Sequence, residues 1–469
     1  MKTPSTSRVS FTRTSLAAVL LLLSMISASA QNFVIITNLV SFNGTNGQQP
    51  SGPLLEATDG NLYGSTLYGG TNGAFAGGIF RVNLSGGFTN LIFFSITNGA
   101  NPNSGLIQGT DNNLYGTTVY GGAYVNSDSN HNGFGTVFKI TTNGDLTVLA
   151  SFDGTNGKSP NALVETAPGI FYGSANSGGA FSNFAGYGFG TVFTTATNSP
   201  LTNVLSFNDA NGGSPSAGLT MLADGSLFGT TTSGGPYEDG TAFRLAADGS
   251  VSADFIFDFT NGAVPGALIA GRDGNLYGTT IFGGSNRFGT VFRMTTNLAL
   301  TTLISFNGTN GNAPTALIQG DDGNFYGLTG QGGRYGFGNV FELKTNGDLL
   351  LLYDFTGGSD GYAGTSLIQG KDGNFYGATS YGGDAGRGNI FKLSIYPLPN
   401  IQTFIATGHS VNFSWAAVPN FTYDVFYVTN LTQTNWSKLR TIIASNLTET
   451  VLDSPLSDQQ RFYRVFLRQ

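Results

Sequence analysis

Cysteine is absent from the 469-residue chain, so no disulfide can brace the fold and no thiolate can act as a nucleophile or metal ligand. Histidine is nearly absent, with only His131 and His409. This scarcity excludes a multi-histidine metal centre, and a serine nucleophile in the repeated part of the chain would have a single histidine as its base. Without disulfides, a chain of this length must be held by buried apolar area.

Charged residues are also scarce. They make up 10% of the chain, whereas an average soluble domain has roughly 25%. The formal net charge is −7, and this sign disfavours nucleic acid and anionic membrane as partners. The surface must therefore be solvated mainly by Asn, Thr, Ser and Gly.

The N-terminus has the pattern of a secretory signal. Lys2, Arg8 and Arg13 precede an apolar run over 16–26 that ends in small residues. We expect residues 1–30 to be a signal peptide, whose removal makes the net charge three units more negative. No later apolar run approaches the ~18 residues that a membrane span needs. The sequence thus predicts a secreted or cell-surface protein, or a periplasmic one, with no membrane span after cleavage.

One phrase, Asp-Gly-Asn-Leu-Tyr-Gly-Thr-Thr, recurs along the chain in seven copies with a period of roughly 50 residues. Its second glycine falls at Gly64, Gly116, Gly173, Gly229, Gly278, Gly327 and Gly377. In the sixth copy, the apolar runs 316–320 and 324–327 flank an Asp-Gly pair, which is a hairpin signal. Two more runs, such as 135–140 and 146–149 in the second copy, flank an Asn-Gly pair. Each copy therefore predicts a four-stranded antiparallel blade of a β-propeller.

The two ends of the repeat indicate how the ring closes. The seventh copy stops after its third strand, 389–393, whereas residues 36–42 match the fourth strand of another copy, 300–306. We expect the N-terminal strand to complete the seventh blade, because an open ring would expose two sheet edges. The predicted fold is all-β, with a seven-bladed propeller over 31–396 and a small β-sandwich over 397–469.

The repeat phrase, followed by Tyr-Gly-Gly and Gly-Thr-Val-Phe-Lys-Ile, resembles the GloVer tandem repeat of exported bacterial proteins over about residues 33–395. The third copy departs most, beginning with Pro168 and Gly169 in place of the Asp-Gly-Asn start. The resemblance implies a secreted, surface-associated protein and carries no catalytic residues. Downstream of it, the runs 410–415, 422–428 and 462–467 resemble a fibronectin type III or immunoglobulin-like sandwich, with Trp415 as the core tryptophan.

Several features that suggest chemistry have structural explanations. The glycine-rich loops lead into strands, whereas a nucleotide loop must open a helix. Asp153 begins a loop whose composition suggests a calcium site, but the equivalent loops of other copies begin with Asn43, Asn208 and Asn307. We therefore expect no metal or other cofactor. A turn role is expected for the aspartates of the repeat phrase, which are Asp59, Asp111, Asp224, Asp273, Asp322 and Asp372.

Residues that break the symmetry of the repeat are the better candidates for function. Loops between the second and third strands share a face with the loops between blades, and we predict that this face binds a ligand. Tyrosines would serve as stacking platforms, and Arg334, Arg387 and Asp384 as hydrogen-bonding groups. The alternative is that these residues form no binding site and are simply scattered loop residues exposed to solvent. The predicted site residues are Asp128, His131, Tyr187, Tyr237, Glu238, Asp239, Arg287, Arg334, Tyr335, Asp384 and Arg387.

A recurring aromatic follows the phrase, at Tyr68, Tyr120, Phe282 and Tyr381. It could line a sugar groove, but Phe and Tyr interchange there, so packing between blades is the favoured interpretation.

The sequence thus favours a secreted, non-catalytic binding or scaffold protein that recognises an extracellular glycan or protein. One alternative is a hydrolase or lyase acting on extracellular polysaccharide, with acids such as Glu238, Asp239 or Asp384. Another is a purely structural adhesin or spacer. The sequence does not predict the oligomeric state.

Overall fold

The computed structural model describes residues 33–71, 75–124, 133–181, 187–197, 199–246, 250–396, 399, 401–407, 410–430, 432–454 and 461–468. The expected signal peptide therefore lies outside the described residues. Within them the fold is all-β, built from antiparallel sheets, and the only helical segment is one turn of 3-10 helix, η1 (Ile96–Asn98). The chain divides into two compact units, one of which is Ile35–Ser394 and the other of which contains Ile395–Gln469.

Seven four-stranded sheets, here numbered in chain order, account for β1 to β28. Sheet 1 contains β2 (Gln48–Glu56), β3 (Leu62–Tyr68), β4 (Gly78–Val82) and β5 (Phe88–Phe93). Sheet 2 contains β6 (Ile107–Gln108), β7 (Leu114–Thr118), β8 (Thr136–Ile140) and β9 (Leu146–Ser151). Sheet 3 contains β10 (Lys158–Ala167), β11 (Ile170–Ser177), β12 (Thr191–Ala196) and β13 (Ser199–Ser206). Sheet 4 contains β14 (Thr220–Met221), β15 (Leu227–Thr231), β16 (Thr241–Leu245) and β17 (Val251–Ile256).

The remaining sheets follow the same plan. Sheet 5 contains β18 (Ala263–Ala270), β19 (Leu276–Phe282), β20 (Thr290–Met294) and β21 (Leu300–Ser305). Sheet 6 contains β22 (Asn312–Gln319), β23 (Phe325–Gln331), β24 (Asn339–Leu343) and β25 (Leu349–Asp354). Sheet 7 contains β26 (Tyr362–Gln369), β27 (Phe375–Tyr381), β28 (Asn389–Tyr396) and the N-terminal β1 (Phe33–Ser41).

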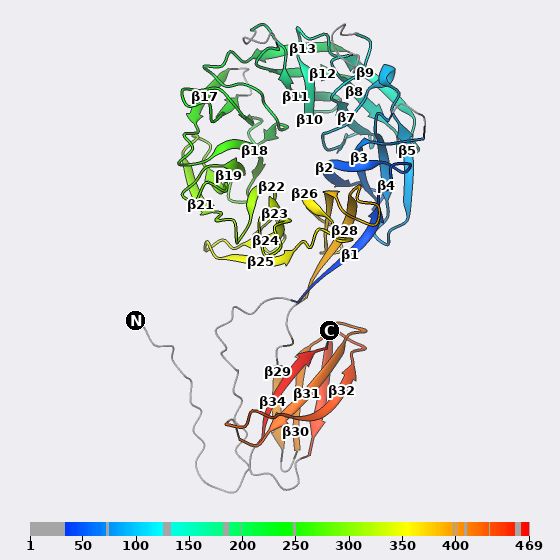
Figure 1. Cartoon of the computed structure of the whole chain (residues 1–469), viewed down its shortest axis with the longest axis vertical. Helices are drawn as coiled ribbons and strands as arrows, with labels where there is room; N and C mark the ends of the chain where they lie inside the picture. The colour runs from blue at the N-terminus through cyan, green and yellow to red at the C-terminus, as the bar shows by residue number, and fades with distance from the viewer. Residues whose placement is uncertain are drawn as a thin grey trace. The chain divides into compact units, whose positions relative to one another are not determined.

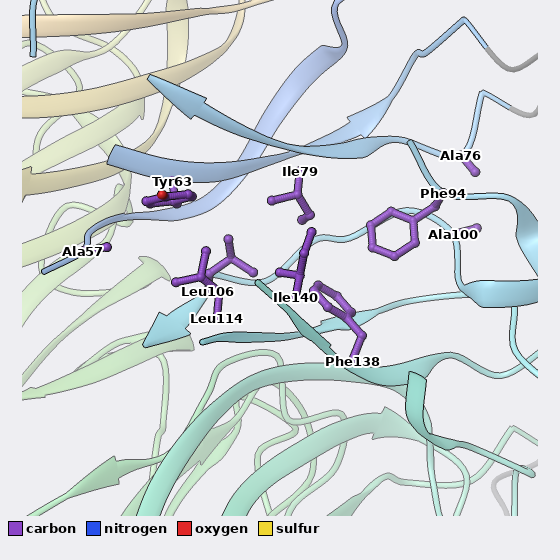
Figure 2. Packing of buried hydrophobic residues seen from close by; sticks show 10 residues of the cluster. All are labelled: Ala57, Tyr63, Ala76, Ile79, Phe94, Ala100, Leu106, Leu114, Phe138 and Ile140. Atoms are coloured by element: carbon purple, nitrogen blue, oxygen red, sulfur yellow. The ribbon is translucent and has the colours of Figure 1, made fainter. Parts of the chain in front are cut away.

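Within the Ile35–Ser394 unit the sheets follow one another around a common centre in chain order (Figure 1). First strands such as β2, β10 and β22 lie toward the centre, and fourth strands such as β5, β13 and β25 lie toward the outside. Adjacent sheets bury apolar side chains between them. Figure 2 shows the layer between sheets 1 and 2, where Tyr63 and Ile79 face Leu114 and Phe138. Both faces of most sheets are thus covered, which explains why the strands lack strict apolar alternation.

The second glycine of the repeat phrase makes room for a phenylalanine of the third strand. In sheet 5, Gly278 pairs with Phe292 across the sheet, and a Cβ on Gly278 would lie 2.6 Å from Phe292 Cζ. The corresponding distance is 2.3–2.7 Å in all seven sheets. The glycine recurs because no side chain fits beside the aromatic ring. The other pairs are Gly64 with Phe80, Gly116 with Phe138, Gly173 with Phe193, Gly229 with Phe243, Gly327 with Phe341 and Gly377 with Phe391.

The N-terminal strand β1 lies beside β28 in sheet 7, the placement that the match between the two ends of the repeat predicts. Just after β1, the N–H of Phe42 donates to the carbonyl of Gly388 at 2.9 Å. Phe42 is fully buried, and its ring lies 5.4 Å from that of Phe80 and 5.8 Å from that of Phe88, measured between centroids. The start of the chain therefore joins the last sheet and packs against the first.

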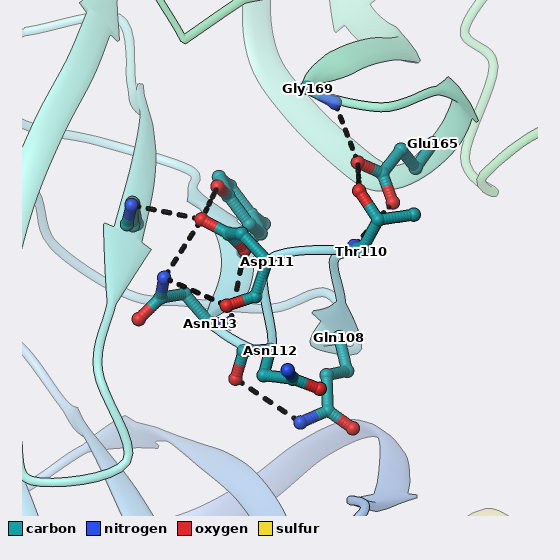
Figure 3. Close-up of polar contacts among 9 residues, drawn as sticks. Gln108, Thr110, Asp111, Asn112, Asn113, Glu165 and Gly169 are labelled. Atoms are coloured by element: carbon teal, nitrogen blue, oxygen red, sulfur yellow. Dashed lines mark hydrogen bonds and ion pairs between the residues drawn. The ribbon is translucent and has the colours of Figure 1, made fainter.

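A hydrogen-bonded clasp links the first turn of one sheet to the first strand of the next. In Figure 3, Glu165 of sheet 3 accepts bonds from the Thr110 N–H at 2.9 Å and the Thr110 hydroxyl at 3.1 Å. Sheet 7 is joined to sheet 1 in the same way, since the N–H of Lys371 donates to Glu56 at 2.9 Å. Further clasps join Thr58 to Gln108, Arg272 to Gln319 and Asp321 to Gln369. The last sheet thus contacts the first as neighbouring sheets contact each other.

The second unit contains two three-stranded sheets. One has β29 (Ile401–Thr407), β30 (Ser410–Ala416) and β33 (Thr448–Asp453), and the other has β32 (Ser437–Ile443), β31 (Thr422–Val428) and β34 (Phe462–Leu467). Trp415, the tryptophan expected in the core, is fully buried. It belongs to a cluster that includes Phe413, Tyr423 and Tyr463, so strands of both sheets contribute to one apolar core.

Candidate binding face

Two sets of loops meet on one face of the Ile35–Ser394 unit. One set joins the second and third strands of each sheet, and the other leads from one sheet to the next. The N–H of Gly122 donates to the carbonyl of Ile96 at 3.0 Å, and the N–H of Gly333 donates to that of Gly308 at 2.9 Å. Equivalent bonds join Gly70 to Gly44, Gly179 to Gly154, Gly235 to Asp209, Gly284 to Phe259 and Gly383 to Gly358. We call this surface the loop face, and the opposite ends of the strands, where the Asp-Gly turns lie, the turn face.

The predicted site residues that are described all lie on the loop face, in the loops between second and third strands. They are Tyr187 in sheet 3, Tyr237, Glu238 and Asp239 in sheet 4, Arg287 in sheet 5, Arg334 and Tyr335 in sheet 6, and Asp384 and Arg387 in sheet 7. Asp128 and His131 lie outside the described residues, as does His409. The structure brings together only those that share a loop. Arg334, for example, holds its guanidinium 5.4 Å from the centre of the Tyr335 ring.

Exposed aromatic side chains collect on the loop face. In the Ile35–Ser394 unit, every described aromatic residue that is exposed lies there, and Tyr237 is 63% exposed. Such side chains present apolar surface to solvent at a fixed position, which is typical of binding sites rather than of a bare loop. The set is Tyr68, Phe75, Tyr124, Phe181, Tyr187, Tyr237, Phe259, Phe282, Phe288, Tyr335, Phe337 and Tyr381.

The favoured interpretation of the recurring aromatic, packing between blades, is wrong for three of its four members. Tyr68, Phe282 and Tyr381 are 38, 49 and 39% exposed. Each is the last residue of the second strand in its sheet, at the point where the loop begins, so the neighbouring sheet does not cover the ring. Tyr120 is half-buried.

Charges are distributed differently on the two faces. Ion pairs of the Ile35–Ser394 unit lie on the turn face, where Lys139 pairs with Asp111, Arg244 with Asp224, Arg272 with Asp321 and Lys392 with Asp372. On the loop face, Arg287, Arg334 and Arg387 are exposed, and none forms an ion pair with any carboxylate in the described part of the chain. Three guanidinium groups on consecutive sheets are thus left to interact with an external group.

A ring of variable residue pairs surrounds the inner edge of the loop face, and sequence reasoning missed it. In five sheets the first residue of the first strand faces the last residue of the second strand, and in sheets 2 and 4 an isolated bridge beyond the strand ends joins the equivalent residues. Two residues further along the first strand of the sheet, the position is occupied by Pro or Gly, as at Pro265 and Gly364. An alignment of the seven copies could have found these variable pairs, because the variable residue of the first strand directly follows a glycine that every copy keeps. The pairs are Gln48–Tyr68, Ala100–Tyr120, Lys158–Ser177, Gly213–Ser233, Ala263–Phe282, Asn312–Gln331 and Tyr362–Tyr381.

Among the predicted acids, Asp239 has the most distinctive environment. Burial, and secondarily the nearby charge of Asp258, raise the pKa of Asp239 above its ordinary value. Asp258 itself is held ionised, because hydrogen bonds from Thr260 and Asn261 lower its pKa despite partial burial. Two carboxyl groups with oppositely shifted pKa values are an arrangement that general acid and base chemistry can use.

The described glycine-rich loops lead into β-strands and do not open a helix. No three His, Asp or Glu side chains are grouped closely enough to hold a metal ion within the described ranges. Likewise, none of the described residues forms a helix long and apolar enough to cross a membrane.

The sequence matches the Gloeobacter/Verrucomicrobia repeat over residues 26–187, 124–267 and 223–412. The chain therefore belongs to this repeat family. Among curated proteins, none matches it in sequence.

Several solved structures are distantly similar. They include the extracellular domain of BT3049 from B. thetaiotaomicron, at 10% identity and a TM-score of 0.49, where the match covers 91% of this chain and 57% of that one. YCF48 from Cyanidioschyzon merolae matches at 8% identity and a TM-score of 0.46, covering 77% of this chain and 99% of YCF48. The gluconolactonase XC5397 from Xanthomonas campestris matches at 12% identity and a TM-score of 0.41, covering 79% of this chain and 93% of the enzyme. Similarity at this level assigns no activity.

Proposed function

We infer that the Ile35–Ser394 unit is a closed, seven-bladed β-propeller that works outside the cell as a non-catalytic binding or scaffold module. Each four-stranded sheet is one blade, and β1 closes the ring by completing sheet 7. The clasp between Lys371 and Glu56, and the burial of Phe42 against sheet 1, support this closure. The second unit is a fibronectin type III-like sandwich in this proposal. Residues 1–30 are the signal that directs export.

The loop face is the binding surface, and its ligand is an extracellular glycan or protein. One observation carries this proposal, namely that the exposed aromatic side chains of the Ile35–Ser394 unit gather on the loop face. The absence of ion pairs for Arg287, Arg334 and Arg387 within the described chain adds polar groups that suit the same role. Aromatic rings bind the apolar faces of sugars or of protein side chains, and arginines supply directed hydrogen bonds.

The test is binding of the purified mature protein to an array of extracellular polysaccharides and to cell surfaces. A triple change of Arg334, Tyr335 and Arg387 to Ala should abolish binding without lowering the unfolding temperature. The control replaces three exposed residues of the turn face, Arg272, Lys344 and Lys371, with Ala. Binding that survives the loop-face change, or that is lost equally in the control, would contradict the proposal.

A second candidate function is hydrolysis or lysis of a polysaccharide. The opposite pKa shifts of Asp239 and Asp258 favour this alternative. It predicts release of shorter oligosaccharides from a bound polymer, measured by a reducing-end assay. Asp239→Asn should then abolish product formation and leave binding unchanged. A bound polymer that is never shortened would leave only the binding role.

A further inference from the structure

The contact between sheets 7 and 1 on the loop face combines an aromatic platform with a fixed, unpaired cation. We call this place, formed by Tyr362, Tyr381, Arg387 and Gln48, the seam site. We propose that the seam site binds a uronic acid residue of an acidic polysaccharide, with the tyrosine pair against the sugar ring and Arg387 on its carboxylate. This inference rests on the proposed glycan-binding function and names the class of sugar.

The platform is the cross-strand pair Tyr362–Tyr381 of β26 and β27. The two rings are stacked, with centroids 5.2 Å apart and planes inclined by 20°. Phe337 of the neighbouring sheet 6 lies against Tyr362 at a centroid distance of 5.4 Å. Sheet 7 alone has two aromatic residues at the variable pair. Tyr362 is half-buried and supports Tyr381, which is exposed. The Tyr381 ring is therefore the apolar surface that suits the C–H face of a pyranose ring.

Arg387 occupies a position that is aromatic in four other sheets. The equivalent residues are Phe134, Phe189, Phe288 and Phe337, and Phe337 lies over Gly357 of the following loop. Arg387 lies over Gly44 in the same way, because a Cβ on Gly44 would be 2.9 Å from Arg387 Nη1. The sequence thus replaces an apolar ring with a guanidinium only where the last sheet meets the first.

Neighbouring groups hold the Arg387 guanidinium in place where sheet 7 meets sheet 1. Arg387 Nη1 donates to Gln48 Oε1, and the Arg387 carbonyl accepts from the N–H of Gln49 at 2.8 Å. A β-bridge joins Arg387 to Gly382, the residue that directly follows Tyr381. The loop therefore keeps the backbone of Arg387 paired with the residue that follows the platform, while its guanidinium reaches Gln48 of sheet 1. Since a guanidinium has five N–H donors, donors remain for a ligand after the bond to Gln48.

The arrangement indicates a carboxylate on a sugar ring rather than another anion. Arg387 forms no ion pair with a carboxylate of the described chain, and a planar guanidinium binds a carboxylate through two parallel bonds. Asp384 is exposed in the same loop, and its charge repels every polyanion, so the preference for a carboxylate rests on the planar fork of Arg387. A uronic acid unit carries such a carboxylate directly on a pyranose ring.

The experiment measures binding of the full mature protein to polygalacturonate and to the same polymer after reduction of its carboxyl groups. We expect wild type to bind the acidic polymer at least tenfold more tightly. Arg387→Gln should remove this preference and leave the weaker binding of the reduced polymer unchanged. Tyr381→Ala should weaken binding of both polymers at least tenfold. Arg272→Gln, the same change on the turn face, serves as the matched control and should behave as wild type.

Other outcomes separate this inference from the proposed function. Wild-type protein that binds both polymers equally, prefers a sulfated polysaccharide, or keeps its preference in Arg387→Gln would overturn the seam site while the glycan-binding role stands. Wild type that binds no glycan would overturn both. If Arg387→Gln lowers the unfolding temperature, Arg387→Lys replaces it, because lysine keeps the charge but loses the planar fork. That variant should keep less than a third of the wild-type preference.

Discussion

The hydroxyl of Tyr277 donates to Oδ2 of Asp273 at 2.8 Å, four residues earlier in the chain. The carboxylate of Asp273 also accepts bonds from the N–H and the side-chain amide of Asn275. The same tyrosine–aspartate bond occurs between Tyr63 and Asp59, Tyr115 and Asp111, Tyr326 and Asp322, and Tyr376 and Asp372. The turn role expected for these aspartates is therefore confirmed. The repeat phrase keeps Asp, Asn and Tyr because together they hold one turn closed.

Acid should destabilise these turns. Burial alone would raise the pKa of Asp273, but hydrogen bonds from Asn275 and Tyr277 outweigh it, so the pKa lies below its ordinary value of 3.8. The stabilisation is then complete above the unfolded-state value and is lost as the pH falls through the folded-state pKa. Lowered pKa values are also found for Asp59, Asp111, Asp224 and Asp372. Calorimetry should show that these groups do not change the unfolding temperature between pH 7 and about pH 4. Below about pH 4 the unfolding temperature should fall steeply.

A single substitution can test whether the carboxylate of Asp273 contributes to this acid sensitivity. Asp273→Ala removes three hydrogen bonds at a partly exposed turn, and we expect it to cost about 1 kcal/mol of stability at pH 7. The difference from wild type should shrink as the pH falls through the folded-state pKa of Asp273, because the wild-type carboxylate then becomes protonated. A difference that stays constant with pH would show that the charge of Asp273 contributes nothing.

Adding a methyl group to the repeat glycine should disrupt a sheet. Gly278→Ala places a Cβ 2.6 Å from Phe292 Cζ, and overpacking of this kind costs about 1–3 kcal/mol. Phe292→Leu in the same chain makes room, so the double variant should be more stable than the sum of the two single changes predicts. Urea denaturation measures all three variants. Strict additivity would mean that the glycine is kept for another reason.

Closure of the ring should depend on Phe42. This side chain is fully buried between sheets 7 and 1, and Phe42→Ala is expected to cost about 3–5 kcal/mol. Phe75→Ala is the control, because Phe75 is 64% exposed on the loop face. Removal of residues 33–42 should give an aggregating product, since the edge of β28 is left bare. A soluble monomer with unchanged melting would argue against closure.

A backbone position next to the variable pairs is strained, and relieving the strain should stabilise the protein. Val264 has φ of 56°, and the same positive φ occurs in all seven sheets, at Gln49, Asn101, Ser159, Ser214, Ala313 and Ala363. A β-branched residue is the least suited to this conformation, whereas asparagine tolerates it. Val264→Asn should raise stability by about 1 kcal/mol in urea denaturation. Val148→Asn, made in a regular strand, should lower it instead.

Much of the fold could be predicted because it depends on local signals. The glycine–phenylalanine contacts recur in each copy and the Asp-Gly pairs in five of the seven, and these short-range preferences suffice to make each sheet. The position of β1 followed from the similarity of residues 36–42 to 300–306. The third copy forms the same hairpin as the others, although Pro168 and Gly169 replace the usual turn residues.

The candidate site was less predictable, because it depends on contacts between distant segments. Arg387 and Gln48 are 339 residues apart in the sequence, and only the meeting of the last sheet with the first brings them together. The exposure of Tyr68 and Tyr381 likewise depends on where the neighbouring sheet ends. A pattern within one copy contains no information about that boundary.

The pairing of β1 with β28 also fixes the order in which the protein can finish folding. β1 pairs with a strand that is synthesised almost 350 residues later, and such distant pairings are slow to form. Six sheets can be complete while the seventh still lacks an edge. Until the final segment arrives, the half-finished polypeptide keeps an unpaired strand edge that is open to pairing with other chains.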